Sequence, residues 1–216
     1  MQNTLHPLSA GRLAARNDPQ TVRARLLLRF SLWYFLLFTA GLLLSRYTAL
    51  GDTPYVDAAV ADMFRSPFGD EGLLRDHIRA VLFSARRECL LLLCIAASGM
   101  TYLATALSDA ALGAHALSFG LTAHRLIVSI LGHTDVEHGN LLFFLYFFSA
   151  LAQGVLLLSA ATEAVVFSFE YRDAGRALRI QREHIAARYL LLLCSHAGIL
   201  LILRAVHTLL LAALLP

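Results

Sequence analysis

Residues 133–169 decide what kind of protein this is: HTDVEHG at 133–139 is followed by NLLFFLYFFSALAQGVLLLSAATEAVVFSF at 140–169. A group of titratable residues therefore stands directly before thirty residues that are almost wholly apolar. Hydrocarbon offers no hydrogen bonds to a peptide backbone, so a run of this length is stable in a membrane only as a helix. The stretch predicts a membrane-spanning helix whose polar start lies at the membrane face or is sheltered by other helices.

The composition agrees with a membrane protein and excludes several other classes. The 216 residues are 58% hydrophobic and 15% charged, whereas soluble domains carry about 25% charged residues. No basic patch is interleaved with aromatic residues in a water-exposed segment, which argues against nucleic-acid binding. The three cysteines lie in apolar runs and are typical of small packing residues rather than of a disulfide framework. We expect one integral membrane domain, residues 1–216.

The charges around the apolar runs predict how the chain is threaded. The basic tail, residues 1–25, is expected in the cytoplasm by the positive-inside rule. The loop 170–188 carries five Arg against three acidic residues, which also indicates the cytoplasm. Both placements hold together only if the middle of the chain crosses the membrane an extra time. We therefore predict an all-α, polytopic membrane helix bundle of about five transmembrane helices, with the N-terminus inside and the C-terminus outside. The expected spans are 26–45, 89–108, 110–123, 140–169 and 189–215.

The third span is the least certain of the five in its extent. The fourteen residues 110–123 rise only about 21 Å as a helix, which is short of the roughly 30 Å of hydrocarbon. The span is therefore short, or it extends back through Ser108. In that case residues 126–131 are expected to form a re-entrant or interfacial piece that neighbouring helices cover. Whether residues 110–131 cross fully or re-enter stays open at this point.

The segment 46–88 is predicted to lie outside and carries six Arg against seven acidic residues. Within it, apolar residues recur at helical spacing over 70–87, against Arg75 and Arg79 on the other face. This pattern predicts an amphipathic helix lying on the bilayer. A packed connecting helix is the alternative. A docking surface for a partner, with Arg75 and Arg79 as contact residues, is a third interpretation.

The polar group before the long apolar run is the first candidate site. His133, Asp135, Glu137 and His138 are ligand types that zinc or another divalent metal accepts. Their spacing matches no established metal motif, and neighbouring residues in a turn diverge. We interpret the group as a polar turn at an interface, with a partner contact as the alternative. No metal or cofactor is predicted.

Ionisable residues inside the apolar runs are the second candidate site, because burying them in a membrane is costly. They are Glu163, His196, Arg204 and His207. A Glu163–His196 pair between two sequential antiparallel helices is an expected contact, more as a structural hydrogen bond than as a proton or ion pathway. The last three lie on one helical face. No nucleophile elbow, P-loop or dinucleotide fingerprint is present, so an enzyme is not predicted.

The order of these features resembles the stage II sporulation protein M family. The likeness is best in RDHIRAVLFSARRECLLLLCIAASGMTYLATALSDAALGAHALSFGLTAHR at 75–125, and it continues in EHGNLLFFLYFFSALAQGVLLLSA at 137–160. His138 and Gly139 match the His-Gly that many members of the wider family place before this span. Glu137 stands where the family often has Pro. The resemblance covers nearly the whole chain as an order of apolar runs with scattered identities.

The resemblance implies a bacterial multi-pass membrane protein of the endospore engulfment machinery, in the mother-cell or septal membrane. It also implies the role of anchoring and localising two peptidoglycan-degrading partners, an amidase/endopeptidase and a lytic transglycosylase. The family has no established catalytic residues, so none is transferred to this chain. Membrane lipid is the other expected partner, and a homo-oligomer is left open.

Two functions from different classes are therefore expected. In the first, the chain is a non-enzymatic scaffold that holds the outer segment 70–87 and the turn 132–139 on one side of the bilayer for hydrolases. In the second, it is a transporter or permease subunit whose Glu163, His196 and Arg204 line a polar path. A metalloenzyme at the 133–138 turn is a third interpretation, and it requires the four side chains to converge on one ion.

Overall fold

The computed structural model describes residues 19–48, 54, 74–132, 139–173 and 179–214. Within these ranges the fold is all-α, with no strand, as predicted. The helices are α2 (Pro19–Tyr47), α4 (Leu74–Ser98), α5 (Ala104–Gly132), α6 (Gly139–Asp173) and α7 (Arg179–Leu214).

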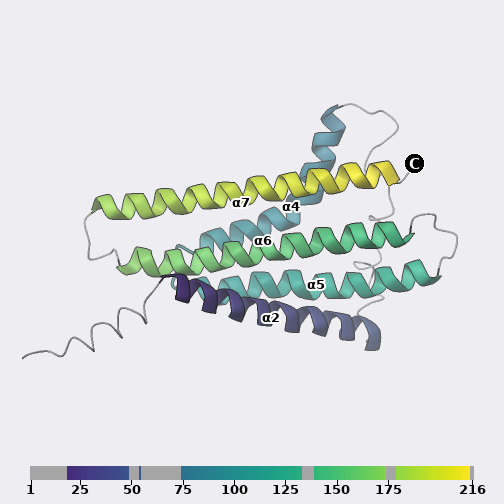
Figure 1. The fold of residues 1–216 in the computed structure, drawn as a ribbon, viewed down its shortest axis with the longest axis horizontal. Coiled ribbons are helices and arrows are strands. Elements are labelled where there is room, and N and C mark those ends of the chain that lie inside the picture. The colour runs from purple at the N-terminus through teal and green to yellow at the C-terminus, as the bar shows by residue number, and fades with distance from the viewer. Residues whose placement is uncertain (1–18, 49–53, 55–73, 133–138, 174–178, 215–216) are drawn as a thin grey trace, which may run out of the picture.

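Successive helices run in opposite directions along one long axis (Figure 1). One end of the bundle holds the start of α2, the α4–α5 turn, the end of α6 and the start of α7; we call it the Arg-rich end, after Arg23, Arg29, Arg172, Arg182 and Arg188. The other end holds the end of α2, the start of α4, the end of α5, the start of α6 and the end of α7. The start of α2, which follows the basic tail, and the loop 170–188 thus belong to the same end of the bundle.

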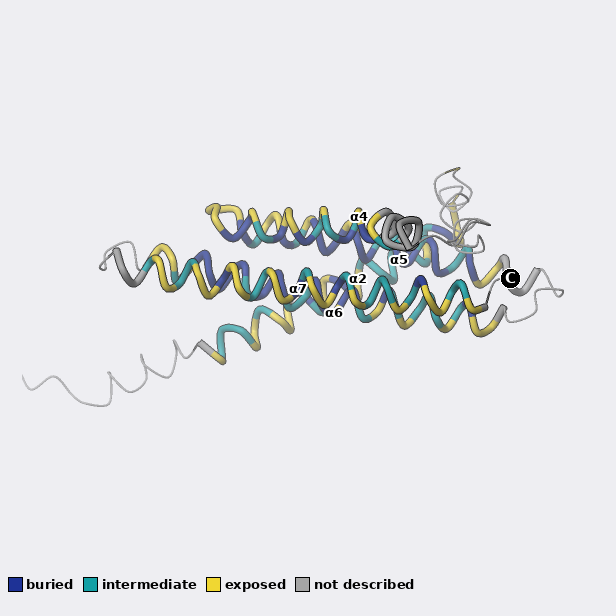
Figure 2. Tube along the Cα trace, turned by 90° about the horizontal axis from the view of Figure 1, so that it is seen from above, coloured by how far each residue is buried: buried dark blue, intermediate teal, exposed yellow. Residues whose placement is uncertain are grey.

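The stretch that decides the fold forms the central helix. α6 contacts each of the other four helices, and Figure 2 shows the buried residues facing inward along the bundle. The core takes a fully buried apolar side chain from every helix, because each helix has one face turned to the interior. These side chains are Phe30, Ile95, Leu112, Leu157 and Leu200.

The outer surface of the bundle is suited to lipid. Three helical segments, Gln20–Tyr47, Asn140–Arg172 and Arg182–Ala213, are long and apolar enough to cross a membrane. Large apolar side chains such as Phe148 and Leu191 are exposed on their outer faces. A surface of this kind is unstable in water over such an area. The chain is therefore a helical membrane protein.

The α2–α5 interface depends on two glycines that let the backbones approach closely. A Cβ atom at Gly120 would lie 2.2 Å from the Phe38 carbonyl oxygen, and one at Gly41 would lie 2.4 Å from the Leu117 carbonyl oxygen. Because neither position carries a side chain, the backbones of the two helices are in direct contact. Small residues at such crossings are typical of membrane helix pairs.

The predicted second span, residues 89–108, is wrong. α4 ends at Ser98 and the chain turns before α5 begins at Ala104. Side-chain hydroxyls end the helix here: Thr101 Oγ1 donates to the Ser98 carbonyl (2.8 Å) and accepts from the Leu103 amide (3.2 Å). Such local bonds compete with helical ones. Residues 89–108 carry no charge, which indicated one continuous span. Their side-chain hydroxyls, however, favour a turn.

The alternative of a re-entrant piece at 126–131 is also wrong. α5 is one uninterrupted helix from Ala104 to Gly132. Its 29 residues rise about 43 Å, which exceeds the hydrocarbon thickness. Gly113 and Gly120 do not break the helix, because both lie against α2, where their missing side chains are used for packing.

The predicted amphipathic helix is the start of α4, which continues into the bundle without a break. Figure 1 shows its first turns projecting past α7 and the rest running inside the bundle. Arg75 and Arg79 lie in these first turns, and their side-chain positions are outside the described part of the chain. Contact of this segment with the bilayer therefore stays a prediction.

Candidate functional site

Arg204 on α7 is the centre of a buried polar cluster that joins three helices. Its Nη2 donates to Oε1 of Glu88 on α4 and to Oε1 of Gln153 on α6, the second over 3.1 Å. The side chains of Arg204 and Glu88 are only 16% and 7% exposed. A buried charge is stable only when it is paired and hydrogen-bonded, so each residue of the pair depends on the other. We call Glu88, Gln153, Arg204 and the neighbouring His207 the Arg204 cluster.

Three polar atoms of the Arg204 cluster are buried without a hydrogen-bond partner among the described residues. They are Oε2 of Glu88, Nε of Arg204 and Nδ1 of His207. The two unpaired atoms of Glu88 and Arg204 belong to the same ion pair, which therefore uses one edge of each group and not a full bidentate contact. Among the described residues, this ion pair thus keeps one free acceptor, Glu88 Oε2, and one free donor, Arg204 Nε, inside the bundle.

Sequence reasoning missed Glu88 as a member of the site. It stands at the edge of an apolar run beside Arg86 and Arg87, so it was assigned to the outer surface. The helix continues past it without a break, and this places Glu88 inside the bundle opposite Arg204. A signal was present, since Arg204 is an intramembrane cation and requires an anion on a neighbouring helix.

Further polar contacts continue this interior between other helix pairs. Thr122 on α5 and Tyr146 on α6 share a hydrogen bond of 2.5 Å. Tyr34 on α2 and His115 on α5 share one of 2.8 Å. The Tyr146 phenol also lies within electrostatic reach of the Arg204 cluster. Each contact joins two helices, so these side chains fix the rotation of one helix against the next.

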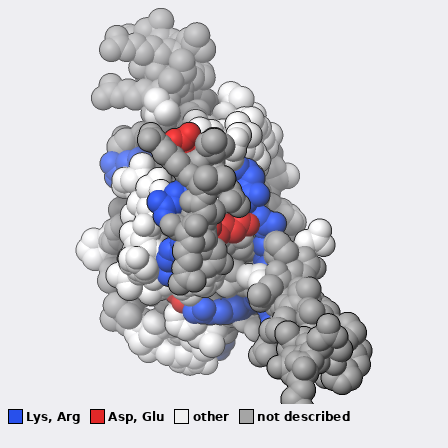
Figure 3. All heavy atoms as spheres, turned by 90° about the vertical axis from the view of Figure 1, so that its left-hand side faces the viewer, with Lys and Arg blue, Asp and Glu red and all other residues white. Residues whose placement is uncertain are grey.

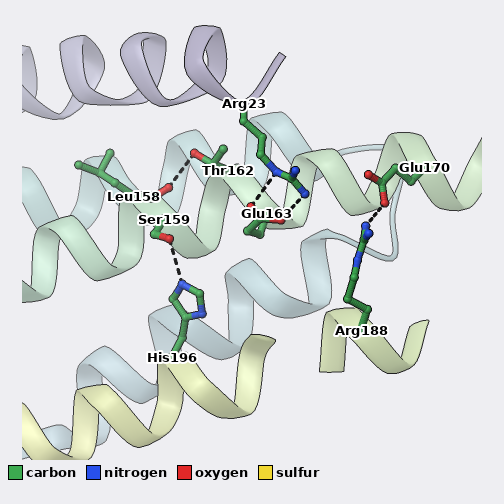
Figure 4. Close-up of polar contacts among 8 residues, drawn as sticks. All are labelled: Arg23, Leu158, Ser159, Thr162, Glu163, Glu170, Arg188 and His196. Atoms are coloured by element: carbon green, nitrogen blue, oxygen red, sulfur yellow. Dashed lines mark hydrogen bonds and ion pairs between the residues drawn. The ribbon is translucent and has the colours of Figure 1, made fainter. Parts of the chain in front are cut away.

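The predicted Glu163–His196 pair does not form (Figure 4). Both carboxylate oxygens of Glu163 accept from Arg23 on α2, over 2.9 and 3.2 Å. His196 Nε2 instead lies 3.1 Å from Ser159 Oγ, and its Nδ1 donates to the Leu192 carbonyl over 2.7 Å. Ser159 is one helical turn before Glu163, so α7 meets α6 one turn away from the expected contact.

The expected common face of α7 is confirmed, because His196 and Leu200 are buried and Arg204 and His207 follow toward the interior. This face nevertheless contacts two separate places. His196 reaches Ser159 on α6, whereas Arg204 reaches α4 and Gln153. Glu163 belongs to neither, since it pairs with α2. The three residues expected to line one path are therefore tied to different partners.

Ion pairs also join the helices at the Arg-rich end. Arg29 on α2 bonds Asp109 on α5 over 2.5 Å, and Arg188 on α7 bonds Glu170 on α6. Figure 3 shows Arg side chains around this end of the bundle, with acidic groups among them. These pairs are partly exposed and lie near the helix ends, where charges cost little to keep.

The remaining predicted site residues are not tested. His133, Asp135, Glu137 and His138 lie outside the described residues. Across the ranges that the structure describes, no group of three or more His, Cys, Asp or Glu side chains could hold a metal ion. The three cysteines are unpaired thiols, at Cys89, Cys94 and Cys194.

Comparison with models of protein families, with curated proteins and with solved structures finds no match for this chain.

Proposed function

We propose that this chain is a non-enzymatic membrane scaffold. One observation carries the proposal: the charged side chains inside the bundle are paired across helices. Arg204 on α7 pairs with Glu88 on α4, and Arg23 on α2 pairs with Glu163 on α6. Charges used in this way hold helices in place. A rigid bundle whose ends carry longer polar segments is suited to positioning other proteins.

The proposed topology has five crossings, with the N-terminus in the cytoplasm. The Arg-rich end receives both the basic tail and the loop 170–188, which supports placing it inside by the positive-inside rule. The connections from α2 to α4 and from α5 to α6 then both belong to the opposite end. Five alternating helices, each of 25 residues or more, support this arrangement.

The proposed partners follow from the resemblance to the stage II sporulation protein M family. The scaffold anchors a peptidoglycan amidase/endopeptidase and a lytic transglycosylase at the septal membrane of a sporulating bacterium. Its outer segments supply the docking surface, with Arg75 and Arg79 on the first turns of α4. Those turns project past α7, which supports their access to a partner (Figure 1).

The test is affinity purification of the tagged chain from crosslinked sporulating cells, with mass spectrometry of the proteins recovered. We expect both wall hydrolases, and we expect their loss on the double charge reversal Arg75→Glu/Arg79→Glu. The matched control is Arg25→Glu on the exposed surface of α2, which should keep them. Recovery of no hydrolase with the unaltered chain would reject the scaffold.

A second candidate, a transporter or permease subunit, is favoured by one observation. The Arg204 cluster keeps a free acceptor on Glu88 and a free donor on Arg204 in a buried place. A polar solute could hydrogen-bond to such groups, and a proton could bind to them, while crossing the membrane. This path would pass Glu88 and Gln153, and not Glu163 and His196. Copurification of an ATP-binding subunit without a hydrolase, together with solute uptake abolished by Glu88→Gln, would favour it over the scaffold.

A further inference from the structure

The turn between α4 and α5 exposes large apolar side chains at the Arg-rich end. Tyr102 is 85% exposed, Met100 is 68% exposed and Leu103 is 62% exposed. None of the residues 99–103 is charged. Three bulky apolar groups on one short turn are unfavourable in bulk water, so this turn requires a cover.

Hydrogen bonds to α6 and α7 hold the turn in its conformation. Ser168 Oγ donates to the Thr101 carbonyl over 3.0 Å, and Tyr189 Oη donates to the Ala96 carbonyl over 2.9 Å. Gly99 lies directly beneath Tyr189, since a Cβ atom there would be 2.6 Å from the Tyr189 hydroxyl. The backbone of the turn is thus anchored on two helices, and its outward side chains are part of the folded structure.

The turn lies beyond the Arg29–Asp109 pair and beside the Arg23–Glu163 pair, because a Cβ atom at Gly99 would be 3.1 Å from the carbonyl oxygen of Ala164. Asp109, which bonds Arg29, is six residues after Leu103 and so about 9 Å deeper along α5. From Asp109 to Gly132 the helix rises about 35 Å, close to the roughly 30 Å of hydrocarbon. A partly exposed ion pair belongs at the edge of the hydrocarbon and not within it. With the edge of the hydrocarbon between these two ion pairs, the turn falls in the headgroup layer, which is about 5–8 Å thick on each side.

A cation accompanies the exposed aromatic ring. The Arg172 guanidinium lies 5.1 Å from the centre of the Tyr102 ring and 5.3 Å from that of Phe169. Its Nε and Nη2 donate to Ser168, and its Nη1 has no partner among the described residues. An arginine stacked on aromatic rings keeps its charge and outer donors available for a phosphate. Tyrosine is itself enriched where membrane meets water.

We propose that the α4–α5 turn is a membrane-interface anchor. Met100, Tyr102 and Leu103 lie among the headgroups and upper acyl carbons of the leaflet at the Arg-rich end, and Arg172 binds a phosphate of an anionic phospholipid. Arg side chains lie around this end of the bundle (Figure 3), and basic groups near a membrane surface attract such lipid. The anchor sets the depth of the bundle and is independent of which proteins the outer segments bind.

The single tryptophan of the chain allows a direct measurement of depth. The full chain carrying Trp33→Phe and Tyr102→Trp is reconstituted in vesicles of phosphatidylcholine and phosphatidylglycerol. Nitroxide labels are placed on the headgroup, near the top of the acyl chain, or near its methyl end. We expect the strongest quenching of the new tryptophan by the first two labels and a clear loss of quenching with the deepest one.

The matched control is Val155→Trp in the same Trp33→Phe background. Val155 is exposed on α6 and lies eight residues, or about 12 Å, inward of Glu163. Its replacement should show the reverse order, with the strongest quenching by the deepest label. The unaltered chain supplies a second measurement, because Trp33 Nε1 donates to the Asp109 carbonyl over 3.1 Å and so marks the level of the Arg29–Asp109 pair. Trp33 should be quenched best near the top of the acyl chain.

Two kinds of quenching result would overturn the anchor, and a separate result would reject the role of Arg172. Quenching of the tryptophan at 102 by aqueous acrylamide and by no lipid label would place the turn in water, open to a soluble protein. Strongest quenching of that residue, or of Trp33, by the deepest label would place the turn inside the hydrocarbon. A separate measurement tests the phosphate contact. Phosphatidylglycerol in the vesicles should shift the emission of the tryptophan at 102 to shorter wavelength, and Arg172→Gln should remove this shift. A shift unchanged by Arg172→Gln would reject the role of Arg172.

Discussion

Arg204 on α7 and Glu88 on α4 form an ion pair inside the bundle, although 116 residues separate them in the chain. Neither residue has another described charge to pair with in the cluster, since the second contact of Arg204 is the Gln153 amide oxygen. The position of α4 against α7 therefore depends on this pair.

Loss of either charge of this pair should destabilise the protein strongly. Arg204→Met leaves the Glu88 carboxylate buried without a cation, and breaking a buried pair costs about 3–5 kcal/mol. The temperature at which half of the detergent-solubilised protein is lost from its monodisperse chromatographic peak measures this effect. Combining Arg204→Met with Glu88→Gln should recover part of the loss, because no charge is then left buried. Equal, additive losses would show that the two residues do not interact.

The Arg23–Glu163 pair should matter much less. Both side chains are partly exposed, and such pairs contribute about 0.2–1 kcal/mol. Glu163→Gln is expected to lower the thermal midpoint only slightly and to leave hydrolase recovery and sporulation intact. Glu88→Gln in the same assay provides the comparison, with a larger loss of stability. Failure of engulfment in the Glu163 variant at a normal protein level would count against a pure scaffold.

Substitution of either interface glycine should separate α2 from α5. Gly120→Ala places a methyl group 2.2 Å from a backbone oxygen that cannot move alone. Forcing an extra carbon into a packed interface typically costs about 1–3 kcal/mol. The control is Gly198→Ala on α7, where a Cβ atom would meet nothing within 4 Å. That change should be neutral or slightly stabilising, because alanine is the better helix former. Equal midpoints for the two variants would contradict the close approach.

Gly99 and Tyr189 should be coupled. Gly99→Ala directs a methyl group at the Tyr189 hydroxyl, which is fixed by its bond to Ala96 and by the stacking of its ring on Phe167, 4.0 Å between centres. Tyr189→Phe alone should lose about 0.5–1.5 kcal/mol with that hydrogen bond. In the Phe background the alanine should cost less, since the clashing oxygen is gone. A double-mutant cycle on thermal midpoints measures this coupling, and strictly additive losses would refute it.

Part of the candidate site was predictable from the sequence. Glu163, His196, Arg204 and His207 stood out because charge is costly in hydrocarbon. Their partners were not predictable, because Arg23 lies in a stretch read as the edge of a cytoplasmic tail, and Glu88 lies at the border of a loop. Both became interior or interfacial only when helices longer than the apolar runs extended past the expected boundaries.

The amino-acid sequence was enough to predict that this protein is a bundle of membrane helices. Long apolar runs leave the backbone no partner but itself, and the distribution of Arg indicated that both basic segments share one end. Only the tertiary structure decided that residues 99–103 turn, that α5 is continuous, and which charges pair. A helix that is apolar on nearly every face carries little information on its rotation or level, so those depend on contacts such as Gly41 with Gly120 and Glu88 with Arg204.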